Sequence, residues 1–225
     1  MIYSRFGVSF QIMKEADIEI VRQWRNDPVV VRNYEFKDYI TPEMQLEWFK
    51  TVNNINNLYT IVWYKGERIG VINMKDIDWE KRCCEGGIFL PDPKHHEGVL
   101  SGTISFMTTE FIFTMFDWHS LSAHVLKENK AVQAFVSMLG YVKAPDQEEE
   151  NNQLFVITRE SYEKRAPKLR KAVSVLIGNN EKGVLHFEPG EFNDPLISQW
   201  EDVVRKSPFV SRVETTTRGR FYCFG

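Results

Sequence analysis

The most constraining feature of this 225-residue sequence is a series of three strand-like segments followed directly by a helix and another strand. Strands are predicted at Leu58–Tyr64, Arg68–Asp78 and Cys83–Leu90, and the short turns between them imply an antiparallel meander. A helix at Val99–Phe116 then leads to a strand at Leu121–Leu126. This strand–helix–strand order predicts two neighbouring parallel strands linked by a right-handed crossover. We therefore expect an α/β fold with a mixed, mostly antiparallel sheet that contains one parallel pair.

Helices are predicted on both sides of this segment. In Glu15–Asp27, apolar residues fall on one face, and a second helix begins at Thr41-Pro42 with Met44, Trp48 and Phe49 directed inward. A third helix, Asn129–Leu139, is closed by Gly140. The acidic loop that follows leads to a short strand at Leu154–Ile157.

The last part of the sequence has the pattern of a small appended α/β unit. It contains one helix and three strand-like segments: Val184–Phe187, Leu196–Lys206, Phe209–Glu214 and Arg220–Phe224. We divide the chain into a main domain at 1–170 and an appendage of unassigned role at 171–225.

Composition and charge exclude several classes of protein. With 28 Lys and Arg against 31 Asp and Glu, the formal net charge is −3, so the chain has no basic footprint for nucleic acid. Three cysteines cannot form a disulfide framework, which favours a reducing cytoplasm. The first residues lack signal-peptide features, and no apolar run approaches the ~20 residues of a membrane helix. The spacing of His95-His96 and Cys83-Cys84 matches no zinc pattern, so we expect no metal.

The connection between Leu90 and Val99 is the first candidate for ligand binding. It carries Gly98 directly before a helix, and the free N–H groups at a helix start form an anion site. By itself this pattern also fits an ordinary strand-to-helix connection.

Other residues have two interpretations each. Glu85 is either a proton acceptor or an exposed strand residue, and Gly86-Gly87 either forms a bulge or ends the strand weakly. Arg25-Asn26 either contacts a substrate or ends the first helix. Tyr34 and Trp79 are candidates for stacking on a substrate, although aromatic residues more often belong to the core.

The order of several short motifs resembles the GNAT acetyltransferases over residues 8–165. These are Trp24-Arg25-Asn26, Ile77-Asp78-Trp79, Glu85–Leu90, the glycine-bearing loop and helix, and Asn129 followed by Gly140-Tyr141. The nearest branch is the nucleotide-sugar amine acetyltransferases of the pseudaminic acid type, and the ribosomal-protein N-terminal acetyltransferases are the neighbouring branch.

The resemblance implies a direct, acetyl-CoA-dependent transfer to a primary amine. In this family two strands part and lodge acetyl-CoA, with Phe89 and Leu90 on the pantetheine arm and Asn129 touching it. Six loop residues would hold the diphosphate: His95, His96, Glu97, Gly98, Val99 and Leu100. Glu85 would take a proton from the acceptor, and the substrate candidates are Arg25, Asn26, Tyr34 and Trp79. The implied acceptor is a small-molecule amine, such as a nucleotide-linked amino sugar, and a homodimer is a possible assembly.

Two departures from the family pattern keep other functions open. Only Gly98 matches the usual phosphate loop, and Glu97 adds negative charge there. Many members also carry a tyrosine that protonates the leaving thiolate, and Val136 stands at that position. The alternatives are therefore a protein N-terminal acetyltransferase, or a catalytically weak CoA-binding or interaction module on the same scaffold.

Overall fold

The computed structural model describes residues 1–32, 36–96 and 98–224, and within them eleven strands form one sheet. The order across the sheet is β10-β11-β9-β1-β2-β3-β4-β5-β6-β8-β7. The strands are β1 (Ile2–Arg5), β2 (Val8–Ile12), β3 (Leu58–Tyr64), β4 (Glu67–Asp78), β5 (Cys83–Phe89), β6 (Ser120–Leu126), β7 (Val142–Lys143), β8 (Asn152–Thr158), β9 (Val184–Phe187), β10 (Val210–Thr216) and β11 (Gly219–Phe224). The helices are α1 (Ile18–Arg25), α2 (Pro28–Val31), α3 (Pro42–Val52), α4 (Gly98–Met115), α5 (Lys130–Leu139), α6 (Arg159–Ile177) and α7 (Pro195–Arg205), with short 3-10 turns η1 (Glu15–Asp17), η2 (Pro93–His95) and η3 (Pro189–Asn193).

The centre of the sheet confirms the predicted topology. Strands β3, β4 and β5 form an antiparallel meander, and β5 pairs with β6 in parallel after the crossover through α4. The bulge lies on β4 rather than at Gly86-Gly87, which pair regularly with Met74 and Asn73. The β4–β5 register shifts between Lys75 and Asp78, where Asp76 has a positive φ of 53°.

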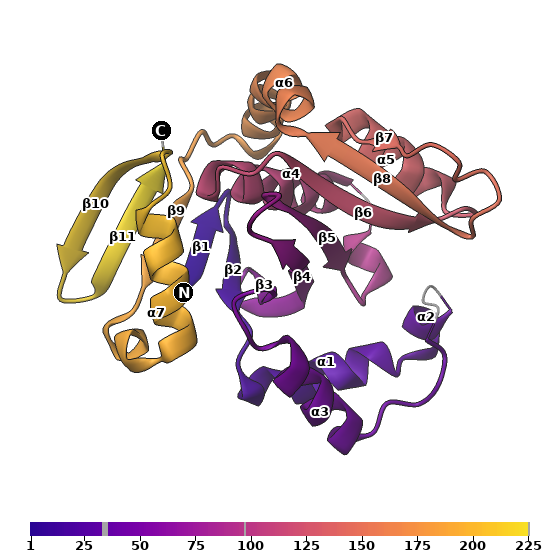
Figure 1. Ribbon diagram of the computed structural model, residues 1–225, viewed down its shortest axis with the longest axis horizontal. Helices are drawn as coiled ribbons and strands as arrows, with labels where there is room; N and C mark the ends of the chain where they lie inside the picture. The colour runs from indigo at the N-terminus through magenta and orange to yellow at the C-terminus, as the bar shows by residue number, and fades with distance from the viewer. Residues whose placement is uncertain (33–35, 97, 225) are drawn as a thin grey trace.

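Two groups of helices cover the two faces of the sheet (Figure 1). Helices α1 and α3 pack on one face, where Val21 and Phe49 are buried against β3 and β4. The core under α4 lies on the other face, and its residues Ile104, Met107, Phe111 and Met115 are buried as predicted. In α3 the prediction for Met44 was wrong: its side chain is exposed, and the neighbouring Gln45 is buried.

The C-terminal segment extends the main sheet. Strand β9 pairs with β1, and the hairpin β10–β11 adds the next two strands outside β9 (Figure 1). Pairing with β1 depends on the N-terminal hairpin β1–β2, which the sequence analysis did not identify. The proposed boundary at 170/171 falls inside α6, and the division into two domains stays a prediction.

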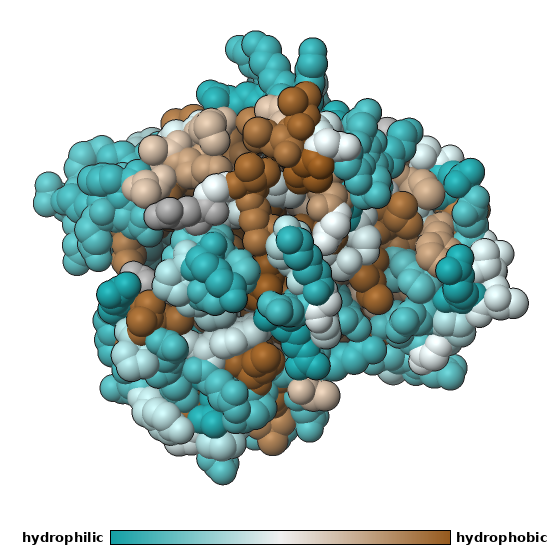
Figure 2. Space-filling view, turned by 180° about the vertical axis from the view of Figure 1, so that it is seen from behind, coloured by the Kyte–Doolittle hydropathy of each residue, from teal (hydrophilic) through white to brown (hydrophobic). Residues whose placement is uncertain are grey.

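The surface alternates between hydrophilic areas and limited hydrophobic ones. Seen from behind, hydrophobic residues gather in a strip across the middle of the molecule, bordered by hydrophilic residues (Figure 2). Among the helices of the described residues, none has both the length and the apolar character that crossing a membrane requires.

Candidate active site

Strands β5 and β6 part in the middle of the sheet. Their parallel pairing runs from Cys83 with Ser120 to Glu85 with Ser122, and then stops. Both strands continue beyond that point, β5 to Phe89 and β6 to Leu126. At the last paired position, the Ser122 hydroxyl donates to the carbonyl oxygen of Cys84 at 3.2 Å. The fork that the resemblance implied is therefore present in the strand pairing.

Glu85 lies at this fork between two basic side chains. One carboxylate oxygen is 3.1 Å from the Lys75 ammonium nitrogen, and the other is 3.1 Å from His124 Nδ1. On β4, Lys75 lies directly across from Glu85. On β6, Ser122 is the residue paired with Glu85, and His124 comes two residues later. The side chains of Lys75, Glu85 and His124 therefore project from the same face of the sheet. The Glu85 side chain is 20% exposed. It is thus held in place and still reachable from solvent.

This face also carries Tyr59, Asn73 and the end of α1. Tyr59 is directly across from Asn73, which in turn is directly across from Gly87. A Cβ atom at Gly87 would lie 2.6 Å from the Asn73 side-chain oxygen, so glycine lets the Asn73 amide lie over β5. Burial, aided by the negative charges of Asp76 and Glu85 and opposed by Arg25, raises the pKa of Tyr59 to about 12. Its hydroxyl therefore remains a proton donor at neutral pH.

The loop before α4 offers fewer main-chain donors than the resemblance implied. The Lys94 amide donates to the Asp92 side chain at 3.0 Å, and the amides of His95 and His96 donate to carbonyls within the same turn. The His96 ring is within hydrogen-bond distance of the Leu90 carbonyl, at 2.6 Å. Glu97 lies outside the described residues.

The start of α4 keeps the features of an anion site. Gly98 has a φ of +81°, and a Cβ atom placed there would meet open space. Val99 and Leu100 follow in the first turn, where helix amides have no carbonyl partner within the helix. Asn129 serves as the N-cap of α5, since its side chain accepts from the Val132 amide at 3.1 Å.

The residues predicted to bind the acceptor substrate do not lie together in one group. Asn26 is engaged at both ends of its amide by the main chain of Ile40, at 2.8 Å each. The Trp79 ring packs against Phe116, Trp118 and Trp200, and its indole N–H donates to Asn56 at 3.0 Å. Among the residues predicted to bind the acceptor, Arg25 has an electrostatic effect near the fork, because its positive charge acts to lower the pKa of Tyr59. Tyr34 lies outside the described residues.

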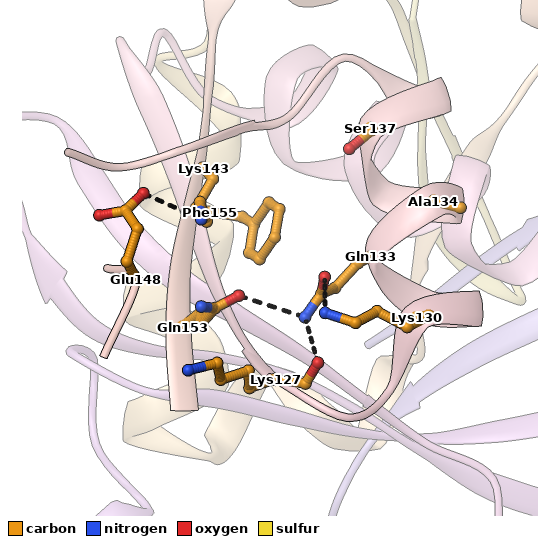
Figure 3. Close-up of a pocket in the computed structure, with 9 residues that line it drawn as sticks. All are labelled: Lys127, Lys130, Gln133, Ala134, Ser137, Lys143, Glu148, Gln153 and Phe155. Carbon is orange, nitrogen blue, oxygen red and sulfur yellow. Dashed lines mark hydrogen bonds and ion pairs between the residues drawn. The ribbon is translucent and has the colours of Figure 1, made fainter. Parts of the chain in front are cut away.

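A cavity of about 410 Å³ lies elsewhere, between α5 and strands β7 and β8 (Figure 3). Phe155, which lines it, is directly across from Ala123 on β6, whereas His124 projects from the opposite face. Its lining is Lys127, Lys130, Gln133, Ala134, Ser137, Lys143, Glu148, Gln153 and Phe155. Because it is on the other face of the sheet from Glu85, this cavity is not the place where Glu85 meets a substrate.

Sequence reasoning missed Lys75, His124 and Tyr59. The parallel register puts His124 next to Glu85, and a crossover of some thirty residues gives no local signal for that register. Val136 stands where many members of the family that this sequence resembles carry a tyrosine, and its side chain is buried. The nearby Tyr141 is also buried, and burial raises the pKa of its hydroxyl above the usual range.

A mixed sheet with a forked parallel pair, a carboxylate at the fork and a helix that begins after the next loop are the features expected of an acyl-CoA-dependent acyltransferase. The family comparison agrees, because the model described as acetyltransferase (GNAT) domain matches residues 9–142. The chain belongs to this family, and it is an acetyl-CoA-dependent N-acetyltransferase. No curated protein matches the sequence.

Solved structures with similar folds include a spermidine N-acetyltransferase from Vibrio cholerae in complex with CoA and spermine. It is 17% identical with a TM-score of 0.62, covering 70% of this chain and 99% of that one. A chimera of the Vibrio cholerae spermidine N-acetyltransferase and hSSAT gives 17% identity and a TM-score of 0.63, over 71% of this chain and 99% of that one. A dodecameric form of the Vibrio cholerae enzyme gives 16% and 0.58, over 70% and 97%. At such identities the likeness concerns the fold.

Proposed function

We propose that the enzyme acetylates the amino group of a nucleotide-linked amino sugar, with Glu85 as the proton acceptor. The observation that carries the proposal is the position of Glu85, which lies between Lys75 and His124 where β5 and β6 part. This position gives a carboxylate both an anchor and access to solvent.

The chemistry requires a base because a primary amine is mostly protonated near pH 7. Acetyl-CoA supplies the acetyl group as an activated thioester. Glu85 accepts one proton from the acceptor ammonium, and the neutral nitrogen then forms the new N–C bond as the C–S bond breaks. A second proton of that nitrogen passes to the leaving thiolate, so CoA departs as the free thiol. His124, at 3.1 Å from Glu85, offers a route by which the proton on Glu85 reaches solvent. No covalent enzyme intermediate is needed, in keeping with a direct transfer.

The charges around Glu85 are of both signs. Lys75 pairs with Glu85, and the positive charge of Arg25 acts on the same face of the sheet as the negative charges of Glu85 and Asp76. A phosphate group on the acceptor would find partners in the two cations, and its amino group would find one in Glu85. An acceptor of the nucleotide-sugar class carries both groups.

For acetyl-CoA, the open edge of β5 and the start of α4 offer the matching groups. Phe89 ends β5 beyond the fork and Leu90 follows it, and Gly98, Val99 and Leu100 begin α4 after the connecting loop. A pantetheine arm hydrogen-bonds to main-chain groups, and a diphosphate suits helix-terminal amides. His95 and His96 would contribute through their side chains, because their amides bond within the turn.

Calorimetric titration with acetyl-CoA, followed by turnover on a panel of amines, tests this proposal. The panel contains a nucleoside-diphosphate amino sugar, a short peptide with a free N-terminus and spermidine. We expect one-site binding and turnover that is highest with the amino sugar. A preference for the peptide or spermidine would reject the proposed acceptor, and binding without turnover on any amine would favour a CoA-binding module.

Substitution of Gly98 tests the diphosphate site with two variants of nearly equal shape. Asparagine and aspartate both tolerate the left-handed conformation of Gly98, which has a φ of +81°. Gly98→Asp places a negative charge where the diphosphate would bind, and one charge repels another by about 1 kcal/mol at 4 Å in water. We expect acetyl-CoA to bind about tenfold more weakly to Gly98→Asp than to Gly98→Asn. Equal affinities, measured by calorimetry, would remove Gly98 from the binding site.

A further inference from the structure

Strand β10 is a long, open edge of the sheet. It is the last strand in the order and runs for seven residues, whereas β7 at the opposite end has two. In Figure 1 it lies at the outer border of the molecule, with β11 on its inner side. All of its residues after Val210 are exposed. An edge of this kind is a template for pairing with another strand.

The pairing with β11 determines which main-chain groups of β10 face outward. Thr216 and Gly219 close a two-residue turn, and such a closing pair is hydrogen-bonded. Because hydrogen-bonded and non-hydrogen-bonded pairs alternate, Glu214 and Arg212 bond to β11 in the same way. The N–H and C=O groups of Val213 and Thr215 therefore point to the open edge.

The sequence of β10 is complementary to itself around Val213. In an antiparallel pair of two copies with Val213 opposite Val213, Arg212 of each copy is opposite Glu214 of the other. Ser211 is then opposite Thr215. We propose that two copies of this chain associate through their β10 strands into one continuous sheet.

The hydrogen-bond pattern strengthens the charge argument. In this arrangement Val213 forms a hydrogen-bonded pair with its copy, so Arg212 and Glu214 fall in the non-hydrogen-bonded pairs, where opposite side chains are closest. Within one copy, Arg212 and Glu214 already share a face and lie 2.9 Å apart. Two copies would thus bring together two positive and two negative charges in alternation.

Other devices that protect an edge from pairing are weak here. Proteins commonly place like charges or proline on an open strand, and such charges would repel a second copy. The described part of β10 has one positive and one negative side chain and no proline. A bulge between Val210 and Arg212 leaves the stretch from Arg212 to Thr216 regularly paired. The edge therefore favours pairing with β10 of a second copy of the chain.

Charge reversal provides a direct test by analytical ultracentrifugation of the full chain. Arg212→Glu places two glutamates opposite each other in both charged pairs, and Glu214→Arg does the same with arginines. We expect self-association of each single variant to be weakened at least about tenfold. An equimolar mixture of the two variants should form heterodimers, and the double variant R212E/E214R should dimerise like the unaltered protein.

A proline variant separates edge pairing from folding. The Val213 N–H does not bond to β11 in this pairing, so Val213→Pro removes an outward donor without removing a hydrogen bond of the hairpin. We expect a monomer with an unchanged circular dichroism spectrum. A monomeric unaltered protein at all concentrations, single variants that dimerise as well as the unaltered protein, or a mixture without heterodimers would each overturn the proposal.

Discussion

Replacing Glu85 by glutamine should lower turnover at least about 100-fold near neutral pH, because general-base catalysis contributes roughly that much. The variant keeps the size of the side chain and removes the group that accepts the acceptor's proton. The loss should shrink as pH rises, because more of the amine then arrives already neutral. Affinity for acetyl-CoA should stay nearly unchanged, so steady-state rates across pH and a calorimetric titration together check the role.

Asp76→Asn is the matched control for this experiment. Asp76 is also a carboxylate beside Lys75, at 3.7 Å, but its side chain is 76% exposed. Asparagine tolerates its positive φ, so the control removes a nearby charge with little strain. We expect this variant to retain most of its turnover. If Glu85→Gln is as active as the unaltered enzyme at every pH, Glu85 is not the base.

Replacing Glu110 by glutamine should destabilise the protein by about 3–5 kcal/mol, the usual cost of breaking a buried ion pair from one side. Glu110 is 1% exposed in α4 and pairs with Arg5 of β1, which is also buried. Its other oxygen accepts from Arg170 of α6 at 2.7 Å. Without this carboxylate, the Arg5 guanidinium is left in the interior beside a second cation. Urea unfolding followed by fluorescence measures the change in free energy of unfolding.

Two further variants distinguish a buried charge effect from general fragility. Glu148→Gln removes an exposed carboxylate that pairs with Lys143 at 3.1 Å. We expect it to leave the urea midpoint of unfolding almost unchanged. The triple variant Arg5→Met, Glu110→Leu, Arg170→Met removes all three charges of the network, and apolar replacement of such networks often leaves the free energy of unfolding unchanged. We expect this variant to regain most of the stability that Glu110→Gln loses. An unchanged midpoint in Glu110→Gln would show that the network contributes little.

Local patterns in the sequence were sufficient for many of the elements. The bounds of β3 match the prediction, and Thr41 and Gly140 mark a helix start and a helix end as expected. These features depend on side-chain periodicity, capping and turn residues, all within a few positions along the chain. Strands β1 and β2 were missed because Phe6 and Gly7, both at positive φ, form a tight turn without a strong turn signature.

The neighbours of Glu85 depend on a detail that local patterns do not reveal. Asp78 pairs with Cys83 next to the turn between β4 and β5. If the pairing continued from there without a bulge, Asp76 would lie opposite Glu85, and two negative charges would be side by side. The bulge on β4 moves the register by one residue and puts Lys75 there instead. The carboxylate thereby gains an ion pair.

The sequence by itself determined the central meander and the strand–helix–strand order that implies a parallel pair, because these follow from periodicity, capping and turn residues within short segments of the chain. Only the tertiary structure decided that His124 lies beside Glu85, that β9 joins β1, and that Asn26 and Trp79 are engaged by other parts of the chain. Those outcomes depend on register and packing between segments far apart in sequence, where many pairings satisfy the same local preferences and only the assembled core selects one.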